Sequence, residues 1–287
     1  MKTVFISTLF LLVTMLSFSQ KKRIKVGDIS RSYILYVPKS IDKTKPTPLV
    51  FNFHGGGMKA SEQMLYTEMN TTAEKNKFIV IYPKGIKGNW NVGFDMDYDK
   101  GTDDVSFVKS ILKEIKESYT IDTNSIFATG LSRGGFFTYR LAIEMPEVFS
   151  AIAPVGAPMP LEVKNKHIVK DKLAVMLIQG KADSLVKFKG KTKAYLSAEE
   201  TIEYWVKHNE NKGVVKTKSI DVIDDETQVT IQTYKGKYGV ALITIKNGGH
   251  TWPGANDFNI GYLLGKTTHD IHANDLIWDF FVTNKRQ

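Results

Sequence analysis

Apolar and polar residues follow two different rhythms along this chain. Short apolar runs bounded by Gly, Pro, Asn or Asp predict buried strands, and apolar residues spaced three to four positions apart predict helices. Strands that alternate with helices form a mostly parallel sheet with helices on both faces, so we expect an α/β fold. The predicted strands are 22–26, 31–37, 48–53, 78–82, 124–129, 151–154, 172–179 and 239–246, and the predicted helices are 61–75, one capped by Thr102 or Asp103, 136–144, 198–209 and 274–282.

Two further runs, 214–223 and 227–234, are separated by an acidic turn and indicate an antiparallel pair at the edge of the sheet. No Pro/Ser/Gly-rich linker and no internal repeat divides the chain. We therefore expect one domain over residues 20–287, without an appended binding module or a separate lid domain.

Ser132 stands between a predicted strand and a predicted helix, in the run GLSRGG. A serine on a sharp strand-to-helix turn adopts a strained backbone, and glycines two positions to either side leave room for the close packing that this turn requires. The hydroxyl is lifted clear of the sheet, beside the positive end of the helix. Ser132 is therefore a candidate nucleophile, although the run alone is also compatible with a glycine-rich turn that contains an incidental serine.

A serine hydroxyl attacks at neutral pH when a histidine removes its proton and a carboxylate holds that histidine in one tautomer. In a strand–serine–helix arrangement the acid and then the histidine follow the serine, each on a loop after a late strand. Asp183 follows strand 172–179 and is the predicted acid, and His250 follows strand 239–246 and is the predicted base. Rival acids by position alone are Asp221, Asp224 and Asp225, and surface roles are expected for His167, His208, His269 and His272.

Acyl transfer also needs two backbone N–H groups that bind the developing oxyanion. One comes from the residue after the nucleophile and the other from the loop after an early strand. Strand 48–53 leads into the run HGGG, whose glycines let the backbone approach a substrate without a Cβ in the way. We predict Gly56 and Arg133 as the two donors. A structural turn is the alternative for HGGG alone, but the motifs occur in the expected order, each after a strand.

The motifs FHGGG, GLSRGG, QGKADSLV and NGGHTWPG resemble the secreted esterase family that groups bacterial polyhydroxybutyrate depolymerase-like proteins with feruloyl and acetylxylan esterases, which are carbohydrate esterase family 1-like. The resemblance runs from residue 23 to the end, and GGHTWPG is its most specific part. It implies an α/β-hydrolase fold with Ser132, Asp183 and His250 as the catalytic triad. Relatives often carry a cysteine where this chain has Gly56, and a small or amide residue where it has Arg133. The backbone donors survive both changes, whereas the shape and charge of the acyl pocket change.

The resemblance implies a carboxylic ester as substrate, and the loops near the motifs suggest which one. Trp252 comes two residues after His250, where an aromatic wall suits a planar phenolic acid or a sugar face, although core packing is equally open. Trp90 and Met58 are further candidates for the cleft. We favour feruloyl or acetyl esters on plant polysaccharide over a solid polyester, which is usually gripped by a separate binding module. A polyhydroxybutyrate depolymerase is the alternative, and a serine peptidase or a non-catalytic binding protein is a weaker one.

The first 19 residues predict a secretory signal peptide. Lys2 precedes an apolar stretch over 4–18 that is short for a membrane span, and Ser17 and Ser19 provide small residues before Gln20. We expect the mature protein to be secreted or periplasmic, without stable membrane insertion, and an uncleaved anchor is the alternative.

Composition adds three constraints. The chain has no cysteine, so no disulfide supports it, and a core must be built from the 42% of residues that are hydrophobic. The net charge is +9, but the lysines are spread along the chain without interleaved aromatic residues, so we expect no nucleic-acid partner. The predicted chemistry requires neither a metal nor an organic cofactor.

Overall fold

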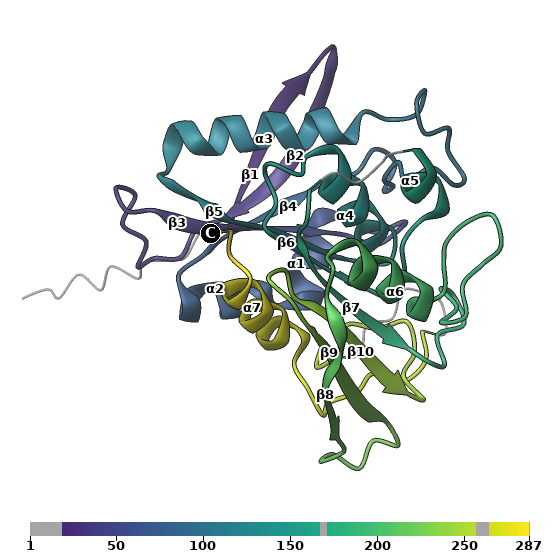
Figure 1. The fold of residues 1–287 in the computed structure, drawn as a ribbon. Coiled ribbons are helices and arrows are strands. Elements are labelled where there is room, and N and C mark those ends of the chain that lie inside the picture. The colour runs from purple at the N-terminus through teal and green to yellow at the C-terminus, as the bar shows by residue number, and fades with distance from the viewer. Residues whose placement is uncertain (1–18, 167–170, 257–263, 287) are drawn as a thin grey trace, which may run out of the picture.

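The computed structural model of the chain describes residues 19–166, 171–256 and 264–286. Apart from Ser19, the predicted signal peptide lies outside these ranges. Ten strands form one sheet in the order β1-β2-β4-β3-β5-β6-β7-β10-β9-β8 (Figure 1). The strands are β1 (Ser19–Val26), β2 (Ile29–Tyr36), β3 (Thr47–Phe53), β4 (Ile79–Pro83), β5 (Ile121–Leu131), β6 (Ala151–Val155), β7 (Ala174–Gly180), β8 (Lys212–Ile220), β9 (Gln228–Lys235) and β10 (Val240–Lys246).

The centre of the sheet is parallel and its two edges are antiparallel. Strands β4, β3, β5, β6, β7 and β10 run in one direction. The β1–β2 hairpin closes one edge and the β9–β8 hairpin closes the other. The second hairpin was predicted as an antiparallel pair at the edge of the sheet, and that prediction is confirmed.

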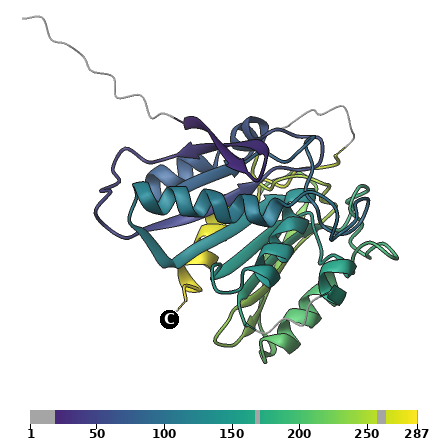
Figure 2. The ribbon, with the colours of Figure 1, turned by 90° about the horizontal axis from the view of Figure 1, so that it is seen from above.

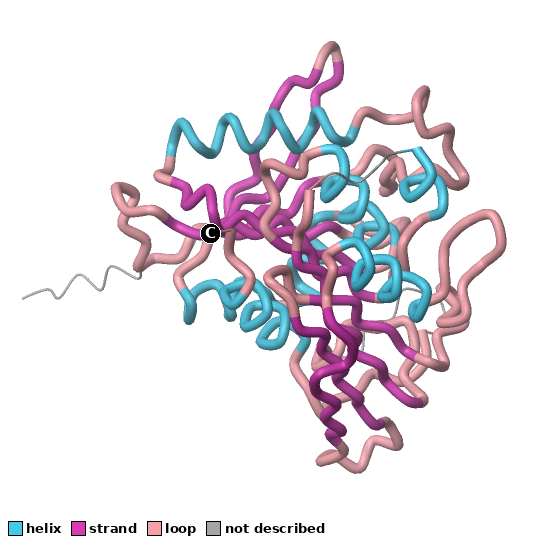
Figure 3. The backbone as a smooth tube through the Cα atoms, viewed as in Figure 1, coloured by secondary structure: helices cyan, strands magenta, loops and turns pink. Residues whose placement is uncertain are grey.

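Helices cover both faces of the sheet, as predicted, and divide the core into two layers (Figures 2 and 3). One layer holds the apolar sides of α3, α4, α5 and α6, and the other holds those of α1, α2 and α7. Strand β3 supplies both layers, because Leu49 and Phe51 enter the first and Val50 enters the second. The helices are α1 (Ala60–Thr67), α2 (Met69–Asn76), α3 (Asp104–Ser118), α4 (Arg133–Glu144), α5 (Leu161–Lys166), α6 (Ala198–His208) and α7 (Ala273–Thr283).

The helix predicted over 61–75 is in fact two helices, and the break lies at Glu68. This residue adopts a left-handed backbone with φ 49° and ψ 27°, which ends α1 and begins α2. In an unbroken helix the N–H of Thr71 would donate to the carbonyl of Thr67. It donates instead to Glu68, and the Thr67 carbonyl accepts from Asn274 Nδ2 at 2.6 Å. A partner 207 residues away thus satisfies the carbonyl that the break leaves free, a contact that local periodicity could not reveal.

No helix within the described ranges is long and apolar enough to cross a membrane. Helix α5 was not predicted, because its six residues are too short to show a period.

Candidate active site

Loops after neighbouring parallel strands meet at one edge of the sheet. The register pairs Phe53 with Gly130, and Leu131 with Val155, so β3, β5 and β6 end level with one another. Strands β7 and β10 end together in the same way, because Ile245 pairs with Gly180. The predicted residues that follow these strand ends are Gly56, Ser132, Arg133, Asp183 and His250. His54 and Gly156, for which no role was predicted, follow strand ends at the same edge.

Ser132 occupies the turn between β5 and α4. Its backbone has φ 52° and ψ −120°, a strained conformation for a residue with a side chain. The turn is tied to β6 by a hydrogen bond of 2.8 Å from Ser132 N to Val155 O. A Cβ at Gly134 would lie 2.3 Å from Phe53 O, so only glycine permits this approach. The side chain of Ser132 is partly exposed, at the N-terminus of a twelve-residue helix.

His250 and Asp183 form a buried pair beside this turn. His250 Nδ1 lies 2.7 Å from Asp183 Oδ2, and the two side chains are 5% and 0% exposed. The carboxylate is held in place by Leu185 N at 3.0 Å and Val186 N at 2.8 Å, which donate to Oδ1. Gln179 Nε2 donates to Oδ2 at 3.1 Å. An aspartate fixed by these donors can hold His250 with its proton on Nδ1, which leaves Nε2 free to accept a proton.

Gly156 lies between His250 and the turn that carries Ser132. This role was not predicted from the sequence. It directly follows Val155, which accepts the hydrogen bond from Ser132 N. A Cβ at Gly156 would lie 3.0 Å from both Cε1 and Nδ1 of His250, and its φ is +62°. The glycine thus lets the imidazole pack directly on the backbone next to Ser132. The available signal was a glycine two residues after the end of the predicted strand 151–154.

The HGGG loop lies against the serine turn, where the two oxyanion donors were predicted. A Cβ at Gly55 would be 3.6 Å from Ser132 Cβ, and one at Gly56 would be 3.7 Å from Arg133 Cβ. Arg133 is the first residue of α4, so its N–H has no acceptor within the helix. The arrangement can therefore present the N–H groups of Gly56 and Arg133 to an oxygen bound beside Ser132.

The side chain of Arg133 turns toward the loop that contains Phe94 and Asp95. Nη1 donates to Phe94 O at 3.1 Å, and Nη2 pairs with Asp95 Oδ2 at 3.0 Å. The guanidinium also lies 4.4 Å over the centroid of the Phe94 ring. Burial lowers the pKa of Arg133, and the neighbouring Asp95 carboxylate opposes that shift. Relatives often carry a small or amide residue at this position, and the positive charge that Arg133 introduces is paired with Asp95 of the same chain.

Trp252, Trp90 and Met58 were the candidates for lining the cleft, but all three are buried, and for Trp252 the core-packing alternative holds. Trp90 is 0% exposed, because it stacks on Phe137 at 5.2 Å and meets Phe53 edge-on at 5.2 Å. Trp252 is 1% exposed and packs in the layer beneath α7. Met58 is 4% exposed and its Sδ lies against Gly55, so it supports the HGGG loop and offers little surface to a substrate.

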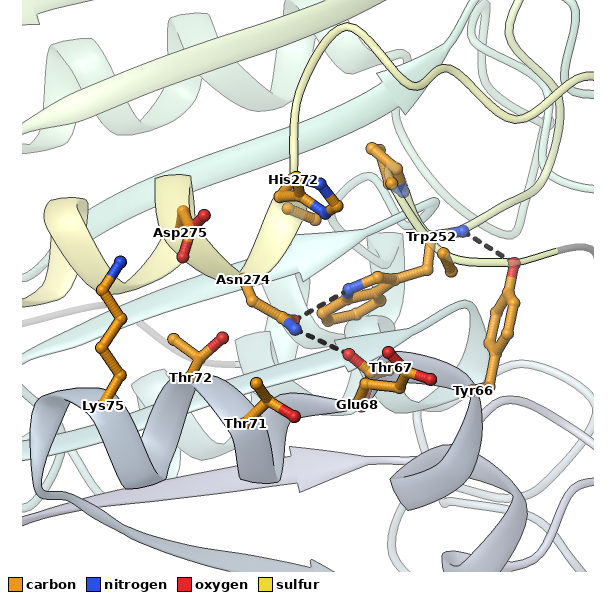
Figure 4. A pocket seen from close by; sticks show the side chains of 14 residues that line it. Tyr66, Thr67, Glu68, Thr71, Thr72, Lys75, Trp252, His272, Asn274 and Asp275 are labelled. Carbon is orange, nitrogen blue, oxygen red and sulfur yellow. Dashed lines mark hydrogen bonds between the residues drawn. The ribbon is translucent and has the colours of Figure 1, made fainter.

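Trp252 connects the loop after β10 to α1 and α7 through two hydrogen bonds (Figure 4). Its N–H donates to Tyr66 Oη at 3.0 Å, and its Nε1 donates to Asn274 Oδ1 at 3.0 Å. The surrounding cavity of about 300 Å³ is lined by residues of α1, α2, the loop 252–255 and the start of α7. None of Ser132, Asp183 and His250 lines it, so it is distinct from the predicted cleft.

The rival acids lie elsewhere, at the turn between β8 and β9. Asp225 accepts from Thr227 N, Thr227 Oγ1 and His269 N. Among the other histidines, His269 and His272 are exposed and His208 is partly exposed, and His167 lies outside the described residues. No group of three or more metal-ligating side chains occurs in the part of the chain that the structure describes.

A model of the esterase PHB depolymerase family matches residues 31–223. The chain belongs to this family. Membership confirms the predicted carboxylic ester hydrolase and the resemblance on which that prediction was based. The matched range of this esterase PHB depolymerase family member contains Ser132 and Asp183 and ends before His250.

Relatives of this family member carry esterase names. NocK of Nocardia uniformis subsp. tsuyamanensis, a protein named as an esterase, is 24% identical over 286 residues, covering 91% of this chain and 82% of NocK. Feruloyl esterase B of Piromyces equi is 25% identical over 234 residues, covering 77% of this chain but only 42% of that enzyme. The solved acetyl xylan esterase from Aspergillus awamori superposes with a TM-score of 0.65 at 17% identity, covering 92% of this chain and 99% of that one. These likenesses confirm the α/β-hydrolase fold.

Proposed function

We propose that this protein is a serine esterase in which Ser132 is the nucleophile, His250 the general base and Asp183 the acid that orients it. The observation that supports this assignment most directly is the 2.7 Å contact between His250 Nδ1 and Asp183 Oδ2, next to the strained turn that carries Ser132. Gly156 supports it further, because its missing side chain is what lets the imidazole approach the serine turn.

The reaction proceeds in two steps through an acyl-enzyme. His250 takes the proton of Ser132 Oγ while that oxygen attacks the ester carbonyl carbon. The N–H groups of Gly56 and Arg133 bind the resulting oxyanion. The bond to the leaving oxygen then breaks, and the alcohol departs with the proton held by His250. Water, deprotonated by His250, attacks the acyl-enzyme, and release of the acid returns the proton to Ser132.

The substrates we propose are feruloyl or acetyl esters on plant polysaccharide. The names of the relatives support this class, whereas the aromatic wall expected from Trp252 gives no support because that ring is buried. The name of the family also includes polyhydroxybutyrate depolymerase, so a polyester is the second candidate substrate. The partner in either case is the ester substrate alone.

The evidence for export comes from residues 1–19, because their charge, apolar stretch and small residues are typical of a signal peptide. We propose cleavage at or near Gln20 and a secreted or periplasmic mature protein. Mass spectrometry of the periplasmic and extracellular fractions tests this, and a protein retaining Met1 would contradict it.

The deciding experiment for the function is hydrolysis of methyl ferulate, acetylated xylan and polyhydroxybutyrate side by side. Ser132→Ala serves as the blank for each substrate. We expect Ser132-dependent release of ferulate or acetate. Release of hydroxybutyrate alone would assign the enzyme to the second candidate, and activity that persists in Ser132→Ala would contradict the proposed mechanism.

A further inference from the structure

The direction of the Gly56 N–H depends on the carbonyl of the residue before it. In a trans peptide the C=O and the following N–H point in opposite directions. The carbonyl of Gly55 accepts from His54 Nδ1 at 2.8 Å and from Met58 N at 3.2 Å. Holding this carbonyl therefore holds the Gly56 N–H on the opposite side. Because both residues are glycines, the peptide would otherwise be free to rotate.

His54 can donate to Gly55 only in one tautomer, and its second nitrogen fixes that tautomer. The Gly85 N–H donates to His54 Nε2 at 2.9 Å, so Nε2 is unprotonated and the proton is on Nδ1. Burial favours this neutral form, since His54 is 0% exposed and its pKa is lowered to about 4. The donor toward Gly55 is thus permanently in place at neutral pH.

A second segment holds His54 and the rest of the loop. Trp90 Nε1 donates to His54 O at 2.9 Å, and the two rings lie 4.9 Å apart. The N–H of Gly57 donates to Gly88 O at 2.9 Å. Residues 85–90 therefore contact both ends of the HGGG loop.

We propose that His54 and Trp90 are positioning residues that hold the Gly55–Gly56 peptide in the orientation that binds the oxyanion before any substrate arrives. The inference rests on the proposed function and adds a role for two residues outside the triad. The side chain of Arg133, the residue of the second donor, bonds to Phe94, which lies four residues after this segment in the same loop between β4 and α3. One loop thus fixes both sides of the oxyanion site.

Two substitutions of His54 separate its two hydrogen bonds. In His54→Asn the amide N–H occupies the place of Nδ1 and can still donate to Gly55. In His54→Gln the amide reaches the place of Nε2, so it can accept from Gly85 but no longer donates to Gly55. We expect kcat of the Asn variant within about three-fold of wild type, and kcat of the Gln variant lower by about 100-fold, the order of magnitude for a lost oxyanion donor. KM should stay within about two-fold in both.

A transition-state analogue distinguishes positioning from general damage. Phenylboronic acid bonds to the nucleophilic serine and places an oxygen in the oxyanion site. Its inhibition constant should rise in His54→Gln by the same factor as kcat falls, and should be nearly unchanged in His54→Asn. Equal losses in the two variants, or no loss in either, would overturn the proposal.

Trp90→Phe tests the same inference if a His54 variant fails to fold. It keeps most of the buried ring and removes the N–H that holds His54 O. Its matched control is Trp205→Phe, because Trp205 is 0% exposed and its Nε1 has no hydrogen-bond partner among the described residues. We expect kcat to fall about ten-fold in Trp90→Phe alone. Equal activity of Trp90→Phe and Trp205→Phe, measured below their melting temperatures, would refute the positioning role. An active Ser132→Ala variant would instead refute the proposed function.

Discussion

Replacing Gly156 with alanine is the most direct way to disturb the predicted base without touching a reacting atom. The new methyl group would lie 3.0 Å from Cε1 and Nδ1 of His250 and 3.8 Å from Asp183 Oδ2. Carbon atoms in favourable contact are about 3.5–4.0 Å apart, so the imidazole must move by roughly half an ångström or more. That movement strains the 2.7 Å bond between His250 and Asp183.

The size of the effect follows from two separate costs. A displacement on the order of 1 Å in a catalytic group can lower the rate by about 100-fold, so we expect kcat/KM to fall by about 10-fold to 100-fold. The positive φ of +62° adds a backbone cost of about 1–2 kcal/mol, which lowers the melting temperature by roughly 2–8 °C.

Gly27→Ala is the matched control for this variant. Gly27 has a similar φ of +56°, but a Cβ there would meet no atom within 4 Å. It should lose stability to a similar extent and keep full activity in a p-nitrophenyl acetate assay at 25 °C. Wild-type kcat/KM in Gly156→Ala, or an equal activity loss in Gly27→Ala, would refute the role given to Gly156.

Three further predictions concern the charged and titratable groups. In p-nitrophenyl acetate hydrolysis, Asp183→Asn should lower kcat about 10⁴-fold because the histidine loses its orienting carboxylate, whereas Asp225→Asn should keep full activity. The free energy of unfolding, measured in urea, should fall as the pH drops from 6.5 to about 4, because His54 takes up a proton more readily in the unfolded chain than in the folded protein. His54 should account for about 3 kcal/mol of this fall, and that part should be missing in His54→Asn. Arg31→Met should lower the free energy of unfolding by about 3–5 kcal/mol, since it leaves the buried Asp104 carboxylate without its partner at 2.7 Å; an unchanged urea midpoint would contradict this.

The sequence was sufficient for the fold and for the order of the motifs around the sheet. Each chemical motif follows an apolar run, and parallel strands bring their carboxyl ends to one edge, so adjacency could be predicted for Asp183 and His250 although they are 67 residues apart. The HGGG loop could be placed beside Ser132 by the same argument. These predictions depend on strand direction and turn chemistry, which are local properties.

What the sequence could not supply depends on contacts between distant segments. A tryptophan in a loop shows the same pattern whether its ring faces a cleft or the core. Trp90 packs against Phe53 and Phe137, and the indole Nε1–H of Trp252 donates to Asn274 Oδ1. The role of His54 was missed for the same reason, because its partner Gly85 lies on another loop.

Covalent labelling tests the central claim, that Ser132 is the nucleophile, most directly. The mature protein would be treated with a fluorophosphonate, digested and mapped by mass spectrometry, while residual ester hydrolysis is measured in parallel. We predict one adduct per chain, on the peptide that contains Ser132, with activity lost in proportion to labelling. A stoichiometric adduct on another residue, or full activity in protein labelled at Ser132, would contradict the mechanism.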